Sequence, residues 1–429
     1  MIFRNDSKAT LACFLAVLGS TLAVVSCGGS SSSSTPPPVT PVANSVTAEV
    51  SAGPAPPSSG FTNFLYVTVT VCMPGTTTCT DVPNVQVDTG SEGLRLLSSA
   101  LGTLAPSSST GLPTINDSSG DVLQECIQFE DGTYIWGPVA TADVEMAGEK
   151  ASSVPIQVIA ATPAFLVPAS CLTLPNNGSL STVATLGANG IIGVGLFPQD
   201  CGGACTSAST SLPAQYFVCP SNVCSVSAVP TNDQLWNPVA LFPADNNGVM
   251  ITMPAIAAGG QATASGSMTF GIGTQTDNAL GSATIYAVDE YGNLPQVTYN
   301  GVAYTSPNNA GFIDSGSAGI YFLDHVTLGI PDCTSGWYCP ASPVAYTVTA
   351  SGANGTSGPV QFTIANADSL FGNATAYAFD DLGADGGSGP SSDEIDLGMP
   401  FFYNRTIFFG IAGTTVPGNV SAPNGYFAF

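Results

Sequence analysis

The sequence has little charge, and basic residues are especially scarce. Its 429 residues include five Lys and Arg against 29 Asp and Glu, so the formal net charge is −24 at pH 7. A surface this acidic repels phosphate backbones, which argues against nucleic acid as a partner. Carboxylates repel one another less when they are protonated, so the composition fits an enzyme that tolerates acid without requiring one.

Histidine is almost absent, because His325 is the only one in the chain. Catalysis by a Ser–His–Asp triad would have to use this residue, yet the sequence contains no Gly-x-Ser-x-Gly motif. We therefore interpret His325 as a surface or helix-capping residue.

Residues that favour helices are also scarce. Lys, Arg and Glu are few, whereas Val, Thr, Phe and Tyr are frequent, and this balance favours strands. The length allows two or three domains with an ample core. The composition therefore predicts an all-β protein.

The N-terminus carries a targeting segment. Two basic residues precede an apolar run, Ala9 to Val25, which is short for a membrane span and ends just before Cys27. Residues 1–26 resemble a bacterial lipoprotein signal peptide, and Gly28 matches the outer-membrane sorting pattern. The resemblance implies that a lipid on Cys27 anchors the protein in the cell envelope, facing the periplasm or the exterior. The alternative is a plain secretory peptide cleaved nearby.

A region rich in Ser, Pro and Gly follows the targeting segment. It includes Ser30–Ser34 and Pro36–Pro38. This composition cannot bury a core. We therefore predict a mobile tether over residues 27–60 and the onset of order near Phe61.

Ten cysteines remain after Cys13 and Cys27 are set aside, and an even number in an exported chain predicts disulfides. Cys72 with Cys79, and Cys333 with Cys339, are close enough to close small loops. The pairing within the cluster Cys201, Cys205, Cys219 and Cys224 is ambiguous, and Cys126 with Cys171 is left as a longer bridge. A metal site in the four-Cys cluster is the weaker alternative, because no His lies nearby.

One short motif occurs twice. Val87-Asp88-Thr89-Gly90-Ser91 is matched by Ile313-Asp314-Ser315-Gly316-Ser317, and the similarity continues without gaps to Leu97 and Leu323. A single Asp-Thr-Gly is a weak signal, because turns favour Asp and Gly. Two copies, each entered by an apolar strand, suggest two similar lobes that each present one carboxylate. Two ordinary polar turns are the alternative.

Paired carboxylates have a well-defined chemistry. Two of them held close together share a proton, since both cannot ionise cheaply. The ionised partner can then activate a water while the protonated partner donates to a substrate carbonyl. Thr89 and Ser315 can fix the carboxylates by hydrogen bonds, and Gly90 and Gly316 allow close backbone approach.

Further motifs extend this pattern. Ile191-Ile192-Gly193 and Ile395-Asp396-Leu397-Gly398 resemble the hydrophobic-hydrophobic-Gly strand that accompanies each Asp loop in pepsin-like, bilobed aspartic proteases. Phe129 to Gly132, with Gly137, resembles the flap hairpin of that family, and Thr406 to Phe409 resembles a late strand. The resemblance covers residues 61–429 in the correct order. The chain also resembles a set of bacterial lipoproteins of unassigned function.

The resemblance implies an all-β fold of two lobes with pseudo-twofold symmetry and a central cleft. The lobes would span residues 61–230, with Asp88, and residues 231–429, with Asp314. It implies an endopeptidase without cofactor or metal that binds an extended polypeptide. Asp88 and Asp314 would be catalytic, Thr89 and Ser315 would interlock the loops, and Ser91 and Ser317 would hold the outer carboxylate oxygens. The flap would include Phe129, Asp131, Gly132 and Tyr134.

Four residues depart from the family pattern. Phe129 stands where a flap Tyr is usual, with Tyr134 or Trp136 as substitutes, and Arg95 stands where Trp is usual. Glu92 adds a charge near the pair, and Asp396 interrupts an apolar strand. These departures motivate the alternative of a catalytically silent peptide- or glycan-binding envelope lipoprotein. An envelope structural protein is a further alternative.

Another acidic run contains Asp380, Asp381, Asp385, Asp393 and Glu394. It lacks the spacing of a calcium loop, so we interpret it as a solvated loop.

Overall fold

The computed structural model describes residues 43–56, 60–106, 111–306, 311–333, 336–386 and 395–429. Over these ranges the protein is mostly β, with a few short helices, as the composition predicts. The predicted signal peptide, residues 1–26, and the predicted lipidation site Cys27 lie outside the described residues.

The largest sheet has 16 strands. Its order is β11 (Ser225–Val226), β10 (Tyr216–Val218), β5 (Gln124–Gln128), β6 (Thr133–Met146), β7 (Glu149–Ile159), β4 (Glu92–Leu97), β9 (Gly190–Val194), β3 (Cys79–Asp88), β2 (Leu65–Cys72), β1 (Ser45–Val50), β13 (Ala264–Phe270), β12 (Gly248–Met253), β23 (Arg405–Gly410), β24 (Tyr426–Ala428) and β14 (Ile285–Ala287), with β8 (Gly178–Ser179) beside β6. Because β6 also pairs with β2, six of these strands form a closed ring of pairings.

Two smaller sheets lie in the second half of the chain. One has the order β16 (Val302–Thr305), β15 (Gln296–Tyr299), β19 (Val344–Ser351) and β20 (Ser357–Ile364), and the other β17 (Gly311–Ile313), β22 (Ile395–Leu397), β18 (Ile320–Phe322) and β21 (Gly383–Ala384). The α-helices are α1 (Ser98–Leu101), α2 (Val183–Leu186), α3 (His325–Leu328) and α4 (Ala367–Phe371). Short 3-10 helices are η2 (Gly102–Leu104), η3 (Gly202–Cys205), η4 (Pro220–Asn222), η5 (Thr231–Asp233), η6 (Pro238–Leu241), η7 (Met399–Phe402) and η8 (Pro417–Asn419). Within the described ranges, no helix has the length and apolar character needed to cross a bilayer.

Local sequence explains several of these elements. Leu65 to Cys72 is rich in β-branched residues and forms β2 as predicted. Asn300 and Gly301 both have positive φ and form the tight turn between β15 and β16, which is the role that Asn-Gly favours. The predicted hairpin end at Cys72 and Cys79 is also present, because these residues are cross-strand partners of β2 and β3.

The tether predicted over residues 27–60 extends too far, since order does not begin at Phe61. Ser45–Val50 forms β1, which pairs along its whole length with β13 and at its end with β2. Ala48 and Val50 are fully buried in the main hydrophobic core. The surrounding Ser and Pro residues conceal this strand in the sequence, and its main partner lies more than 200 residues away.

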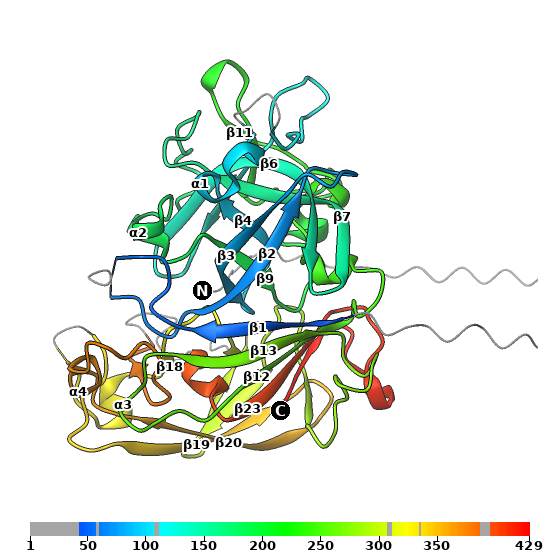
Figure 1. Ribbon diagram of the computed structural model, residues 1–429. Coiled ribbons are helices and arrows are strands. Elements are labelled where there is room, and N and C mark those ends of the chain that lie inside the picture. Colours follow the sequence, from blue (N-terminus) through cyan, green and yellow to red (C-terminus); the bar gives the residue numbers. More distant parts are fainter. Residues whose placement is uncertain (1–42, 57–59, 107–110, 307–310, 334–335, 387–394) are drawn as a thin grey trace, which may run out of the picture.

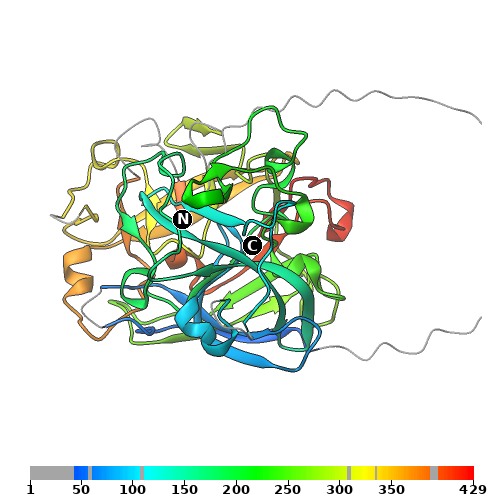
Figure 2. The ribbon, with the colours of Figure 1, turned by 90° about the horizontal axis from the view of Figure 1, so that it is seen from above.

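β1 runs through the middle of the molecule. Figure 1 shows the strands of the first half, blue to green, above β1, and most of the second half, green to red, below it. The main hydrophobic core draws residues from both groups, including Val87 of the first and Ile313 of the second. In the view from above, α4, coloured orange, lies at the outer margin of the molecule (Figure 2). The residues that precede the two Asp motifs therefore pack together where the two groups of strands meet.

The same arrangement of three strands surrounds each Asp motif. β3, which ends at Asp88, pairs in parallel with β9, and β9 pairs antiparallel with β4. In the second half, β17 before Asp314 pairs in parallel with β22, and β22 pairs antiparallel with β18. The predicted Gly strands are β9 and β22, so each accompanies its Asp loop.

The disulfides agree with the predicted pairs and resolve the ambiguous cluster. Cys72–Cys79, Cys126–Cys171 and Cys333–Cys339 are bonded. Within the cluster, Cys201 pairs with Cys205 and Cys219 with Cys224. All four sulfur atoms of the cluster are thus in disulfides, which removes the thiolates that a metal ion would need.

Gly193 of β9 is expected to be essential for folding. A Cβ placed on it would lie 2.6 Å from the carbonyl carbon of Glu92, which has no room to move, whereas one on Gly203 would meet nothing within 4 Å. We expect Gly193→Ala to lower the free energy of unfolding by at least about 1–3 kcal/mol in urea titrations. Gly203→Ala is the matched control, and equal stability of the two variants would contradict the close packing.

Candidate active site

The two Asp loops are locked together by reciprocal hydrogen bonds. The Ser315 backbone N–H donates to Thr89 Oγ1 at 2.9 Å, and Ser315 Oγ donates to the Val87 carbonyl at 2.8 Å. Thr89 Oγ1 in turn reaches the Ile313 carbonyl at 3.4 Å. All these bonds are buried. Each loop therefore satisfies polar groups of the other, which fixes their relative position.

Each carboxyl is held in the same way by its own loop. Asp88 Oδ1 accepts from the Gly90 N–H at 2.9 Å, and Asp314 Oδ1 from the Gly316 N–H at 2.7 Å. The outer oxygens accept from the hydroxyl three residues later: Ser91 at 2.7 Å for Asp88, and Ser317 at 3.0 Å for Asp314. The equivalence of these contacts follows from the repeat in the sequence.

The two carboxyls meet at Gly316. A Cβ on this residue would lie 2.6 Å from Asp88 Oδ1 and 3.0 Å from Asp314 Oδ1, so only Gly fits there. Asp88 also makes a side-chain hydrogen bond with Asp314. Such a bond requires a proton on one carboxyl. The pair is almost completely buried, with exposed fractions of 1% for Asp88 and 0% for Asp314.

Burial and mutual repulsion explain how the pair retains its proton. Burial first, and then the charge of Asp314, raise the pKa of Asp88 from 3.8 to about 7, against the opposing hydrogen bond from Ser91. Asp88 therefore keeps its proton up to about neutral pH. One carboxylate and one carboxylic acid in contact can act together as base and acid.

Glu92 is a third carboxyl near the pair. It follows Ser91 directly, is buried, and its Oε1 accepts from the Phe197 N–H at 3.1 Å. Burial and, to a smaller extent, the charge of Asp88 raise the pKa of Glu92 from 4.5 to about 8, against the opposing hydrogen bond from the Phe197 N–H. Glu92 thus keeps its proton at the pH values where Asp88 keeps its own.

Asp396 is a fourth carboxyl, on β22 beside Asp314. Its side chain hydrogen-bonds Ser317, the residue that also donates to Asp314. Burial first, and then the charge of Asp314, raise the pKa of Asp396 well above its usual range. The residue that interrupts the predicted apolar strand therefore lies next to the site.

Arg95 occupies the position where the resemblance leads one to expect Trp, and it forms a buried ion network. Its Nη2 lies 2.6 Å from Glu125 Oε1 and 3.4 Å from Asp200 Oδ2, and all three side chains are fully buried. Its Nη1 donates to the Glu92 carbonyl at 2.7 Å. The Tyr216 hydroxyl bonds to Asp200 at 2.8 Å. The network therefore connects the strand after the Asp88 loop with β5 at the base of the flap hairpin.

The predicted flap is the hairpin of β5 and β6. Asp131 Oδ1 accepts from the Thr133 N–H at 2.9 Å, and Gly132 has a φ of 78°, which together close the turn. Phe129 is buried in a cluster against which Ala318, the residue after Ser317, also packs. The charges of Asp131 and Asp314 both raise the pKa of Tyr321, which places the hairpin tip opposite the Asp314 loop.

Tyr134 and Trp136, the substitutes suggested for the flap Tyr, lie on the face of β6 opposite to Ile135. Alternate residues of a strand face opposite sides. Ile135 shares the Phe129 cluster, whereas Trp136 and Tyr134 join a separate cluster with the Cys126–Cys171 bridge. The Trp136 indole N–H donates to the Phe165 carbonyl at 3.0 Å.

Two further residues support the site without any clear signal in the sequence. Gln86 Nε2 donates to the Gly316 carbonyl at 3.2 Å, across the two halves. Asn63 is fully buried, with positive φ, and its amide donates to the carbonyls of Ala318 and Phe379. In the sequence both look like ordinary polar residues in or next to apolar strands. Only their hydrogen-bond partners, which are far away in the chain, show that they support the site.

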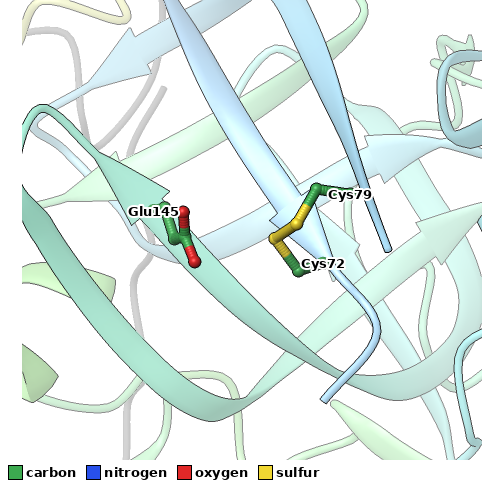
Figure 3. Close-up of side chains that lie close together, drawn as sticks. All are labelled: Cys72, Cys79 and Glu145. Carbon is green, nitrogen blue, oxygen red and sulfur yellow. A yellow bond between two sulfur atoms is a disulfide. The ribbon is translucent and has the colours of Figure 1, made fainter. Parts of the chain in front are cut away.

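Among the described residues, three groups of side chains have the composition of a metal site. In one of them Asp368 lies near Cys333 and Cys339, whose sulfur atoms are bonded to each other. Figure 3 shows Glu145 near Cys72 and Cys79, but these sulfur atoms are bonded to each other, and Glu145 pairs with Lys150 at 3.0 Å. His325 lies 3.0 Å from Asp332 and 3.4 Å from Asp385 on the surface. His325 belongs to α3 and is a surface residue, as we interpreted it from the sequence.

The family model described as "Protein of unknown function (DUF3443)" matches residues 40–429. The chain belongs to the DUF3443 family. No curated protein matches this DUF3443 protein. Among solved structures it is similar to the aspartic proteinase from Irpex lacteus, with 15% sequence identity and a TM-score of 0.44. That match covers 90% of this chain and 97% of the other.

Removal of Arg95 is expected to destabilise the DUF3443 protein strongly. Arg95→Met leaves Glu125 and Asp200 buried without their cation, and the loss of one partner of a buried pair costs about 3–5 kcal/mol. Urea unfolding measures this loss. Lys150→Met, which removes a partly exposed pair, is the control with little expected change. A similar small effect in both variants would contradict the role of the network.

Stability is expected to fall as the pH rises through neutrality. The folded-state pKa values of Asp88 and Glu92 are raised to about 7 and about 8, from 3.8 and 4.5. At pH values between the unfolded-state and folded-state pKa values, the folded state binds more protons than the unfolded state. The stabilising contribution that is present at acid pH is therefore lost as the pH rises through this window. Each pKa unit corresponds to about 1.4 kcal/mol. Urea unfolding at pH 5 and pH 8.5 measures the difference, which should shrink in Asp88→Asn; greater stability at pH 8.5 would contradict the assignment.

Proposed function

We propose that this DUF3443 protein is an aspartic endopeptidase that hydrolyses peptide bonds with a water activated between Asp88 and Asp314. The observation that carries the proposal is the hydrogen bond between these two buried carboxyls, each of which also has an identical set of donors in its own loop. Structural carboxylates are normally separated or paired with cations, because two like charges in a buried place are costly. Holding two together is useful for acid–base chemistry.

The proposed fold has two lobes related by a pseudo-twofold axis, with a substrate cleft between them. The support is the repeated arrangement of β3, β9 and β4 around Asp88 and of β17, β22 and β18 around Asp314. The reciprocal bonds of Thr89 and Ser315 would lie at that axis. The lobes would correspond to residues 61–230 and 231–429, with β1 shared between them.

The mechanism needs one proton on the pair. The ionised carboxylate takes a proton from the water as its oxygen attacks the peptide carbonyl carbon, and the protonated carboxyl donates to the carbonyl oxygen. The resulting tetrahedral diol collapses as one carboxyl donates its proton to the leaving amine and the other carboxylate takes a proton from a diol hydroxyl. The C–N bond breaks, and the water supplies the new hydroxyl of the acid product. The pair ends with the single proton it began with.

The proposed substrate is a polypeptide in an extended conformation. A strand-like peptide would lie beneath the hairpin of β5 and β6, whose tip stands opposite the Asp314 loop. We further propose that the protein resides in the bacterial cell envelope, as an outer-membrane lipoprotein held by Cys27. The support for that location is the sequence alone.

The direct test is hydrolysis of an unfolded protein between acid and neutral pH. Asp88→Asn and Asp314→Asn should each lower activity by at least about 100-fold, because each removes one member of the acid–base pair. A transition-state mimic such as pepstatin should inhibit the parent protein. Asp368→Asn, on the exposed side of α4, is the control for loss of a carboxylate.

Undiminished activity in Asp88→Asn or Asp314→Asn would rule out the mechanism. Saturable binding of peptide or glycan without cleavage at any pH would instead support the alternative of a silent binding protein. Folding of each variant is checked by the same urea titration used for the stability predictions.

A further inference from the structure

The carboxyl of Asp396 lies beside the Asp pair, because it shares the Ser317 hydroxyl with Asp314. Its strand neighbours Ile395 and Leu397 both belong to the main hydrophobic core, and alternate residues of a strand point to opposite faces. Asp396 is the cross-strand partner of Tyr321 on β18, so both side chains share the face that the hairpin tip approaches.

One oxygen of this carboxyl is unsatisfied. Asp396 is 6% exposed, and its Oδ1 has no hydrogen-bond partner in the described structure, although its side chain bonds to Ser317. A buried polar atom without a partner costs free energy, so such atoms are few in native proteins and call for an explanation. A ligand group that enters the site could supply the hydrogen-bond partner that this oxygen lacks.

The surroundings of Asp396 are negatively charged. Asp314 lies beside it, and the charge of Glu130 at the hairpin tip also raises the pKa of Asp396. Ser317 has one hydroxyl hydrogen, which it cannot donate to both Asp314 and Asp396. The site therefore concentrates acidic groups around a single shared donor.

Every basic side chain in the described ranges is engaged elsewhere. Arg95 pairs with Glu125 and Asp200, and Lys150 pairs with Asp143 and Glu145. Arg405 donates to the Phe401 carbonyl at 2.7 Å and lies over the Phe401 ring. His325 lies with Asp332 and Asp385. The described residues thus offer no cation to Asp396.

We infer that Asp396 is a specificity-determining residue that receives the cationic side chain of a lysine or arginine close to the bond that is cut. The inference rests on the proposed function and narrows its substrate class to basic polypeptides. A neutral N–H donor would satisfy Oδ1 alone. A cation also offsets the repulsion among Asp396, Asp314 and Glu130, so a cationic side chain binds here more favourably than a neutral N–H donor.

The test compares two series of fluorogenic peptides with the full-length protein. In one series a single lysine occupies each position around the cleaved bond in turn, and in the other norleucine replaces it. At one position we expect the lysine peptide to have a kcat/KM at least about tenfold higher, since a desolvated charge pair contributes substantially to recognition. In Asp396→Asn, which keeps the size of the side chain, this ratio should fall to near one. Asp368→Asn, the exposed control, should keep it.

Equal kcat/KM for lysine and norleucine peptides at every position, or an unchanged ratio in Asp396→Asn, would overturn the inference. In that case Asp88-dependent cleavage would still support the proposed function. If neither series is cleaved, the proposed function fails, and binding of the same peptides, followed by fluorescence anisotropy, decides the inference. Tighter binding of a lysine peptide that is lost in Asp396→Asn supports the cation site, and equal binding overturns it.

Discussion

The hydrogen bonds that Thr89 and Ser315 exchange across the two halves of the molecule are the contacts on which the rest of the site depends. They are buried, and each satisfies a backbone group of the opposite loop. A displacement of either half would leave several polar groups without partners in a place that water cannot reach, at a cost of about 1–3 kcal/mol each. Two carboxyls that would otherwise repel each other are therefore kept in contact by the loops that carry them.

The site combines a high density of acids with very few bases. The buried acids form two groups, one around Arg95 and one around the Asp pair. Asp200 and Glu125 surround the buried Arg95 within the first half of the chain. Around the pair, burial raises the pKa of Asp88, Glu92 and Asp396, as it also does for Asp200. The buried cation thus belongs to a structural network, and none of the acids around the pair forms an ion pair with it.

The sequence predicted those features that repeat or that depend on near neighbours. The two Asp motifs, their Gly strands and the small disulfide loops could be recognised because each is defined by residues close together in the chain. β1 was not predicted, because its six residues lie among Ser and Pro and their partner β13 is far away in sequence. The partners of Arg95 were missed for the same reason, since Glu125 and Asp200 come from separate segments. Strand parity turns the side chain of Tyr134 to the opposite face from Ile135, and this depends on the cluster that each residue joins and not on its neighbours in sequence.

The central position of β1 has a consequence for how this chain is processed. Ser45–Val50 is hydrogen-bonded to β13 on one side and to β2 at its end, so it belongs to the interior of the sheet and not to its margin. A cut after this strand would leave the edges of β2 and β13 bare, and bare edges recruit other chains. A cut that removes the segment before the folded part therefore leaves the sheet intact only when it lies upstream of Ser45.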